Sequence, residues 1–247
     1  MDKRYEVILF DCFNTVFLPD SARLPMTVVD GKPTLSTAGT LSEQLRHHRD
    51  GITPEAVYRA HREAWRWAES QRGEEVREVP AHSRFRHMLG LLGLHGAEDE
   101  LVEHLLGLHT NLVANSYVLP AAYAALLRRL EQRHRLALFS NFDYAPALRR
   151  LLRGQGLDAL FDPIVISAEI GYRKPGKAAF DLALAPIPQS REAILFVGDS
   201  LADDVVGAAG AGLTVVWING AENSPPEGAQ PDFVIRDLTH LEALLQG

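Results

Sequence analysis

The chain contains almost no cysteine and no long apolar stretch, and each shortage excludes a class of protein. Cys12 is the single cysteine in 247 residues, so an intrachain disulfide framework and a cysteine-rich metal site are both excluded. No run approaches the roughly 18 consecutive apolar residues that a membrane-spanning helix needs. The apolar run near the start is too short for a signal peptide. We therefore expect a cytoplasmic protein that does not interact with a membrane.

Basic residues are also fewer than acidic ones. The chain has 25 Lys and Arg against 32 Asp and Glu, which gives a formal net charge of −7. An acidic balance favours solubility and argues against nucleic acid or an anionic membrane as the main partner. The expected partner is a small molecule, and we expect the protein to be a monomer or a homodimer.

Short apolar runs alternate with helical stretches through the second half of the chain. This alternation is typical of a parallel sheet that helices cover on both faces. It predicts an α/β fold, doubly wound and Rossmann-like. The predicted strands are residues 5–10, 135–139, 164–166, 193–197, 213–217 and 233–235. The predicted helices between and after them are residues 145–153, 176–184, 203–211 and 238–244.

The region between the first strand and the others has mostly helical periodicity. Its predicted helices are residues 41–48, 54–72, 81–92 and 97–115. Near its start, β-forming residues flank Asp30-Gly31 and indicate a small hairpin. We therefore expect two domains, a core of residues 1–17 and 116–247 and an inserted, mostly helical domain of residues 18–115. Residues 223–228 contain two prolines and are expected to form a loop.

Three of the predicted strands end in polar residues. Asp11 follows the first strand, Ser140-Asn141 follows the second, and Asp199 follows a strand that ends at Gly198. Ligands bind outside the carboxyl ends of the strands in an open parallel sheet, so we expect these side chains to share one cleft.

Two further charged residues are candidates for the same cleft. Lys174 lies just before Pro175, a residue suited to the first position of a helix. Asp204 comes five residues after Asp199. Carboxylates suit Mg²⁺, which prefers oxygen ligands, and a carboxylate can also act as a nucleophile. The lysine would offset their charge, and Ser140 and Asn141 would offer donors to phosphoryl oxygens. The set therefore indicates phosphoryl transfer.

The order of these motifs resembles the haloacid dehalogenase superfamily over nearly the whole chain. The matching segments are Asp11…Thr15, Ser140-Asn141, Lys174-Pro175 and Gly198-Asp199-Ser200…Asp204…Gly207-Ala208. The inserted helical region lies where members of this superfamily carry a cap domain.

The resemblance also implies a role for each residue. Asp11 would be the nucleophile, Ser140 would bind the transferring group, and Lys174 would orient the nucleophile. Mg²⁺ would be held by Asp11, the backbone carbonyl of Phe13 and Asp199, with Asp204 assisting.

Phe13 departs from the pattern of the phosphatases in this superfamily. Those enzymes usually have a second Asp two residues after the nucleophile, which protonates the leaving group and then activates water. Phenylalanine can do neither, and such a group contributes ~10²–10⁴ in rate. Asn14 stands where Gly is usual, and Asn tolerates a positive φ better than most residues.

Two alternatives to a phosphohydrolase remain open. The aromatic residue at position 13 and the Ser140-Asn141 pair resemble metal-free 2-haloacid dehalogenases, in which a halide leaves without protonation. The segment from Gly198 to Asp204 resembles instead the metal-binding form of the last motif. The third possibility is a binding protein that keeps the scaffold with little or no turnover.

Overall fold

The central sheet of the computed structural model, which describes residues 5–221 and 230–246, contains six parallel strands. Their order is β10-β9-β8-β1-β6-β7, and every pairing between neighbours is parallel. The strands are β1 (Val7–Phe10), β6 (Arg135–Ser140), β7 (Ile164–Ile166), β8 (Ile194–Gly198), β9 (Thr214–Ile218) and β10 (Phe233–Ile235). The predicted α/β, doubly wound fold is therefore confirmed. The loop expected at residues 223–228 lies outside the described residues.

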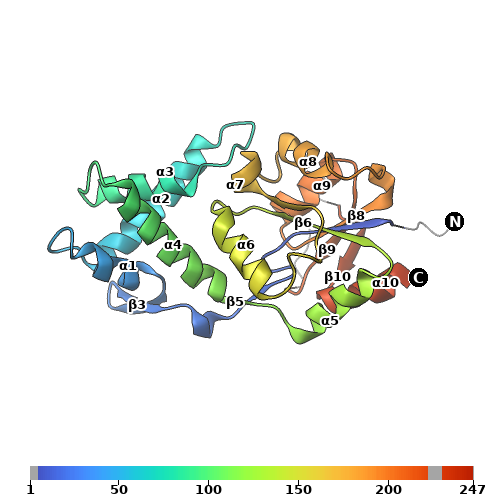
Figure 1. The fold of residues 1–247 in the computed structure, drawn as a ribbon, viewed down its shortest axis with the longest axis horizontal. Helices are drawn as coiled ribbons and strands as arrows, with labels where there is room; N and C mark the ends of the chain where they lie inside the picture. Colours follow the sequence, from blue (N-terminus) through green and yellow to red (C-terminus); the bar gives the residue numbers. More distant parts are fainter. Residues whose placement is uncertain (1–4, 222–229, 247) are drawn as a thin grey trace.

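Helices cover both faces of this sheet (Figure 1). Successive strand residues point to opposite faces, so Val7 and Leu9 pack on one side while Ile8 and Phe10 pack on the other. The first side is covered by α8 (Lys177–Leu184) and α9 (Val206–Gly210). The second side is covered by α5 (Ala121–Leu130), α6 (Ala145–Gly154) and α10 (Leu241–Gln246). Burial on both faces explains why these strands are almost continuously apolar.

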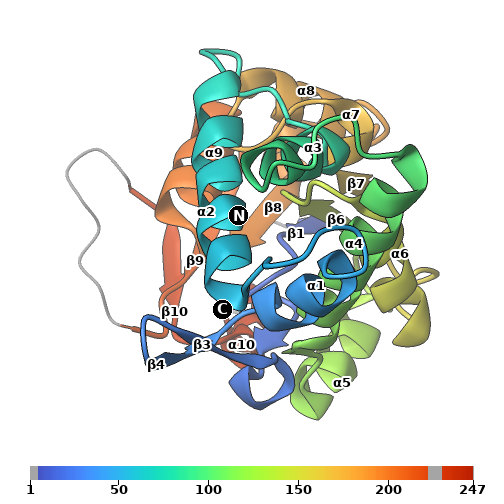
Figure 2. The ribbon, with the colours of Figure 1, turned by 90° about the vertical axis from the view of Figure 1, so that its left-hand side faces the viewer.

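The inserted helices pack around a hydrophobic core of their own. They are α1 (Ala38–Leu45), α2 (Pro54–Gln71), α3 (Ala81–Leu91) and α4 (Asp99–Asn115). Together they lie to the left of the sheet in Figure 1 and in front of it in Figure 2, beyond the carboxyl ends of the strands. Tyr144, the N-cap of α6, and Ala147 within that helix also join this core.

Short antiparallel strands complete the inserted region. β3 (Met26–Val29) and β4 (Lys32–Leu35) form the predicted hairpin, with Asp30 and Gly31 at φ 50° and 75°. Positive φ at both central residues is what a type I′ turn requires. A second pair, β2 (Leu18–Pro19) with β5 (Tyr117–Val118), forms where the chain leaves the sheet and returns to it.

Several boundaries differ from the predicted ones. α5 was not predicted, and the four-residue α7 (Ser167–Ile170) follows β7 directly. α8 begins at Lys177 with Gly176 as its N-cap, so the prediction that Pro175 occupies the first helical position is wrong. A π-helical turn, η3 (Leu201–Val205), precedes α9. None of the helices in the described part of the chain combines the length and apolarity needed to cross a membrane.

Candidate active site

The three polar strand ends lie side by side at one edge of the sheet. Asp11 follows β1, which lies between β8 and β6 in the sheet. β6 ends at Ser140, and β8 ends at Gly198, just before Asp199. Because all three strands are parallel, their carboxyl ends meet at the same edge. A pocket of 380 Å³ opens there. Its lining residues are Asp11, Phe13, Asn14, Ser140, Asn141, Arg173, Lys174, Asp199, Ser200, Asp203 and Asp204.

Lys174 is the buried cation at the centre of this pocket. Its Nζ lies 2.6 Å from Oδ1 of Asp11 and 2.7 Å from Oδ1 of Asp204, and it also donates to the backbone carbonyl of Phe139 at 3.0 Å. Only 1% of its side chain is exposed. Burial lowers the pKa of Lys174, but the two carboxylates raise it further, so the net shift is upward and the ammonium stays charged.

Three carboxylates crowd around this single cation. One oxygen each of Asp11, Asp199 and Asp204 lies within 4.8 Å of the others. Burial raises the pKa of Asp11 to about 7, with Lys174 opposing the shift and Asp204 adding to it. Burial and then the charge of Asp204 raise the pKa of Asp199 to about 6. Crowded, desolvated carboxylates repel one another, and a hard divalent cation with oxygen ligands relieves that repulsion. The donor set therefore fits Mg²⁺.

Asp204 fixes the turn that carries Asp199. Its Oδ2 accepts from the backbone N–H of Asp199 at 3.1 Å and of Ser200 at 3.0 Å. The carboxyl group packs so closely on Gly198 that a Cβ at this glycine would lie 2.4 Å from Oδ2. Glycine is therefore required at position 198, and Asp204 links the end of β8 to Lys174.

Ser140 and Asn141 have different surroundings. The hydroxyl of Ser140 is buried and has no partner that meets hydrogen-bond geometry among the described residues, with the weakly polar thiol of Cys12 nearby. The amide of Asn141 donates to the carbonyl of Lys174 at 3.0 Å and to Asp203 at 3.2 Å, and its oxygen accepts from Lys174 N–H at 2.8 Å. Both polar atoms of the Asn141 side chain are thus used within the protein, whereas the buried Ser140 hydroxyl has no such partner among the described residues.

The turn after Asp11 is closed by backbone hydrogen bonds and by Asn14. Asn14 has φ 63°, as the sequence allowed, and its side chain bonds to Asp199. The ring of Phe13 packs against Tyr117 and Phe142, with centroids 4.6 and 5.2 Å away. An aromatic cluster of Phe13, Tyr117 and Phe142 therefore adjoins the pocket, which Phe13 lines.

One buried carboxylate near the site was not predicted from the sequence. Glu78, in the loop after α2, binds Arg173 at 3.1 Å and accepts from Ser167 at the start of α7. Ser167 in turn accepts from the backbone N–H of Phe142 at 2.8 Å. No sequence motif marks Glu78, because its partners are about 90 residues away or more along the chain.

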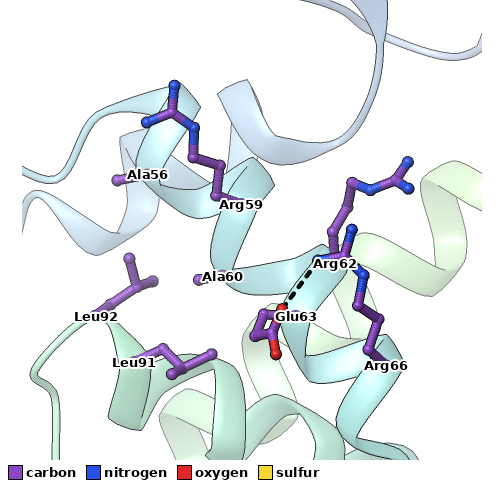
Figure 3. A pocket seen from close by; sticks show the side chains of 8 residues that line it. All are labelled: Ala56, Arg59, Ala60, Arg62, Glu63, Arg66, Leu91 and Leu92. Atoms are coloured by element: carbon purple, nitrogen blue, oxygen red, sulfur yellow. Dashed lines mark hydrogen bonds and ion pairs between the residues drawn. The ribbon is translucent and has the colours of Figure 1, made fainter. Parts of the chain in front are cut away.

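A second hollow lies on the inserted helices and has a different character (Figure 3). It measures 540 Å³ and contains none of the predicted site residues. Arg59 and Arg62 point away from each other, and Arg66 forms an exposed ion pair with Glu63 at 2.9 Å. Its lining residues are Ala56, Arg59, Ala60, Arg62, Glu63, Arg66, Leu91 and Leu92. No buried carboxylate or nucleophile lies there, so the strand-end pocket is the candidate active site.

The family of the chain follows from a sequence comparison that agrees with this geometry. The model of haloacid dehalogenase-like hydrolases matches residues 5–212, which include every motif described above. The chain belongs to this family and is a hydrolase.

Individual relatives cover the chain to different extents. YfnB of Bacillus subtilis is 26% identical over 98% of this chain and 96% of its own length. Pyrimidine 5′-nucleotidase YjjG of Escherichia coli is 37% identical, but the match spans 51% of this chain and only 56% of that enzyme. (S)-2-haloacid dehalogenase 2 of Pseudomonas sp. is 32% identical over 44% of this chain and 48% of its own length.

Solved structures of the same fold cover nearly the whole chain. A crystal structure of YfnB bound to magnesium has a TM-score of 0.63 at 25% identity and covers 99% of this chain and all of that one. A 2-haloacid dehalogenase of Pseudomonas syringae has a TM-score of 0.69 at 18% identity and covers 98% of each chain. The second likeness supports the fold alone.

Proposed function

We propose that this protein is a Mg²⁺-dependent phosphohydrolase that acts on a small phosphorylated metabolite through an aspartyl-phosphate on Asp11. The observation that carries the proposal is the cluster of carboxylate oxygens of buried Asp11 and Asp204 and half-buried Asp199, which lie within 4.8 Å of one another, with Lys174 in contact with Asp11 and Asp204. Two relatives support it, the pyrimidine 5′-nucleotidase and a phosphoserine phosphatase of Thermus thermophilus, the latter 37% identical over 48% of this chain.

In this mechanism an oxygen of Asp11 attacks phosphorus, and the bond from phosphorus to the leaving oxygen breaks. Water then attacks the aspartyl-phosphate, which releases phosphate and restores the carboxylate; water gives up a proton to solvent, from which the leaving oxygen takes one. Lys174 holds Asp11 in place through their 2.6 Å contact. The free hydroxyl of Ser140 donates to an oxygen of the transferring phosphoryl group. Asn141 positions Lys174 by holding both the N–H and the carbonyl of its peptide groups.

Mg²⁺ would be bound by Asp11 and Asp199, with the backbone carbonyl of Phe13 as a further ligand. When bound, the ion supplies positive charge that neutralises the carboxylates and the phosphate. Asp204 supports this arrangement through the backbone of Asp199 and through Lys174. We also propose that residues 18–115 act as a cap that excludes water and selects the substrate.

Phe13 affects which phosphate substrates should react fastest. Without an acid at this position, substrates whose leaving group needs no proton, such as acyl phosphates or aryl phosphates, should react faster than alkyl phosphates.

Metal-free 2-haloacid hydrolysis is the second candidate function, and Phe13 is the observation that favours it. The aromatic side chains of Phe13, Tyr117 and Phe142 supply no proton donor, and a halide leaves as an anion that needs none. The relative named (S)-2-haloacid dehalogenase 2 supports it as well. The three crowded carboxylates argue against it, because a metal-free reaction leaves their repulsion without compensation.

A substrate panel separates the two functions. Acetyl phosphate, p-nitrophenyl phosphate and 2-chloropropionate are each incubated with Mg²⁺ and with EDTA, and phosphate or chloride release is measured. We expect phosphate release that EDTA stops. Turnover of 2-chloropropionate alone, unaffected by EDTA, contradicts the proposal and supports the dehalogenase.

A further inference from the structure

Arg173 is a pocket residue to which the proposed chemistry gives no role. It directly precedes Lys174 and lines the same pocket as Asp11 and Ser140. Its side chain is 13% exposed, so the guanidinium is largely desolvated at the border of the site. A desolvated arginine beside a reaction centre binds oxyanions strongly, because its charge is weakly screened and its donors have a fixed geometry.

Glu78 accepts hydrogen bonds from one nitrogen of the Arg173 guanidinium. Nη1 of Arg173 lies 3.1 and 3.2 Å from the two carboxylate oxygens of Glu78, whose side chain is only 3% exposed. Glu78 is itself fixed by the hydroxyl of Ser167 and by the N–H of Val79 at 3.1 Å. The backbone N–H of Arg173 also donates to the carbonyl of Val76 at 3.1 Å. The orientation of Arg173 is therefore set by the loop after α2.

The other nitrogens of Arg173 remain available. Among the residues that the structure describes, neither Nε nor Nη2 of Arg173 donates a hydrogen bond. A second guanidinium lies nearby, because burial and then the charge of Arg173 lower the pKa of Arg72 at the end of α2, with the charges of Glu78, Glu69 and Asp203 opposing the shift. A planar group with free donors in this position fits a carboxylate or phosphate oxygen pair.

We propose that Arg173, oriented by Glu78, binds a second anionic group of the substrate beside the phosphate that Asp11 attacks. The inference rests on the proposed phosphohydrolase function and names its substrate class, a phosphate ester that also carries a carboxylate or another phosphate. Arg173 is the binding residue, and Glu78 is a positioning residue that acts through it.

Matched substrate pairs test the proposal with the wild-type protein. Phosphoglycolate against ethyl phosphate varies a carboxylate, and fructose 1,6-bisphosphate against fructose 6-phosphate varies a second phosphate. A charge-assisted hydrogen bond should raise kcat/KM for one acid-bearing member by about 10- to 100-fold over its partner. The pair that shows the larger ratio identifies which anionic group is bound.

Substitutions then assign the preference to Arg173. In Arg173→Gln we expect the kcat/KM ratio of the preferred pair to fall by about tenfold or more. Arg149→Gln is the matched control, because Arg149 also pairs with a glutamate, Glu169, but at the exposed surface. In Arg149→Gln the kcat/KM ratio of the preferred pair should equal that of the wild type. The double variant Glu78→Gln/Arg173→Gln avoids a buried unpaired carboxylate and provides a folded protein if the single variant unfolds.

A positioning role for Glu78 has its own readout. Glu78→Gln alone should reduce the kcat/KM ratio of the preferred substrate pair. When Arg173→Gln is already present, adding Glu78→Gln should not reduce this ratio further. A purely structural role would lower the activity on both members of a pair equally and leave the ratio intact.

The outcomes separate failure of this inference from failure of the proposed function. Hydrolysis of phosphate esters with no preference within either pair, or a preference that survives in Arg173→Gln and in the double variant, overturns the inference alone. No hydrolysis of any phosphate, p-nitrophenyl phosphate included, overturns the proposed function and the inference with it.

Discussion

The candidate active site and the junction between α3 and the sheet both bury charged side chains, but they balance them differently. At the site, three carboxylates lie close together, and two of them pair with one lysine, Lys174. At the junction, Arg84 of α3 pairs with a single acid, Asp143, whose Oδ2 accepts from Nε at 2.9 Å and from Nη2 at 2.6 Å. Their side chains are 1% and 8% exposed.

This difference separates a site that binds ligands from a structural contact. The junction is neutral without any ligand, since burial and the charge of Arg84 also lower the pKa of neighbouring His61 to about 3 and keep it uncharged. The three carboxylates at the site outnumber Lys174, and a bound divalent cation would offset the excess negative charge. Substitutions at the site should therefore affect turnover, whereas those at the junction should affect stability.

The largest expected effect is that of Asp11→Asn. The variant keeps the size of the side chain but loses the nucleophile, so kcat should fall by ~10⁴-fold or more. Phosphate release from p-nitrophenyl phosphate measures it, and circular dichroism confirms the fold. Activity within about tenfold of the wild type would contradict the assignment of Asp11.

Metal removal should have the next largest effect. EDTA is expected to reduce phosphate release to background, and excess Mg²⁺ should restore it, because the carboxylates otherwise repel each other and the phosphate. Asp199→Asn should raise the Mg²⁺ concentration needed for half-maximal activity. Ser190→Ala, a substitution in the loop before β8, is the control and should leave that concentration unchanged.

At the junction, Arg84→Leu should destabilise the fold. It leaves Asp143 buried without its partner, which costs about 3–5 kcal/mol in the free energy of unfolding. Denaturant titration measures this loss. Arg149→Leu breaks the exposed pair with Glu169 and should cost about 0–1 kcal/mol. An equal loss of unfolding free energy in the two variants would show that the buried Arg84–Asp143 pair matters no more for stability than an exposed ion pair.

The smallest effect concerns Phe13. Phe13→Asp introduces an acid at the pocket border and should raise kcat for ethyl phosphate by ~10²-fold, with little gain for p-nitrophenyl phosphate, whose leaving group needs no proton. Phe13→Asn is the control, because it loses the same packing against Tyr117 and Phe142 without supplying an acid. A similar gain in kcat for ethyl phosphate in both variants would contradict the explanation that the wild-type protein lacks a proton donor at position 13.

The sequence predicted the sheet and the convergence of its strand ends because both depend on local patterns. Asp11, Ser140 and Asp199 each end an apolar run, and parallel strands bring such ends together. α5 was missed although its signal was present, since Tyr123, Leu126, Leu127 and Leu130 have helical spacing and are buried.

Other features could not be predicted from local patterns. The amide of Asn141 binds the backbone of Lys174, and only the folded loops show that it is not free for substrate. Glu78 and Arg84 belong to the inserted region, and each is paired with a residue of the sheet's loops. Contacts between segments so distant in the chain leave no periodic or spacing signal in the sequence.

The most direct test of the account is crystallography of the protein with saturating Mg²⁺. We expect an ion bound by carboxylate oxygens of Asp11 and Asp199 at about 2.1 Å, with Lys174 still in contact with Asp11. A well-ordered site without an ion, or an ion that binds elsewhere while these carboxylates stay apart, would contradict the claim that the excess negative charge of this pocket exists to bind a divalent cation.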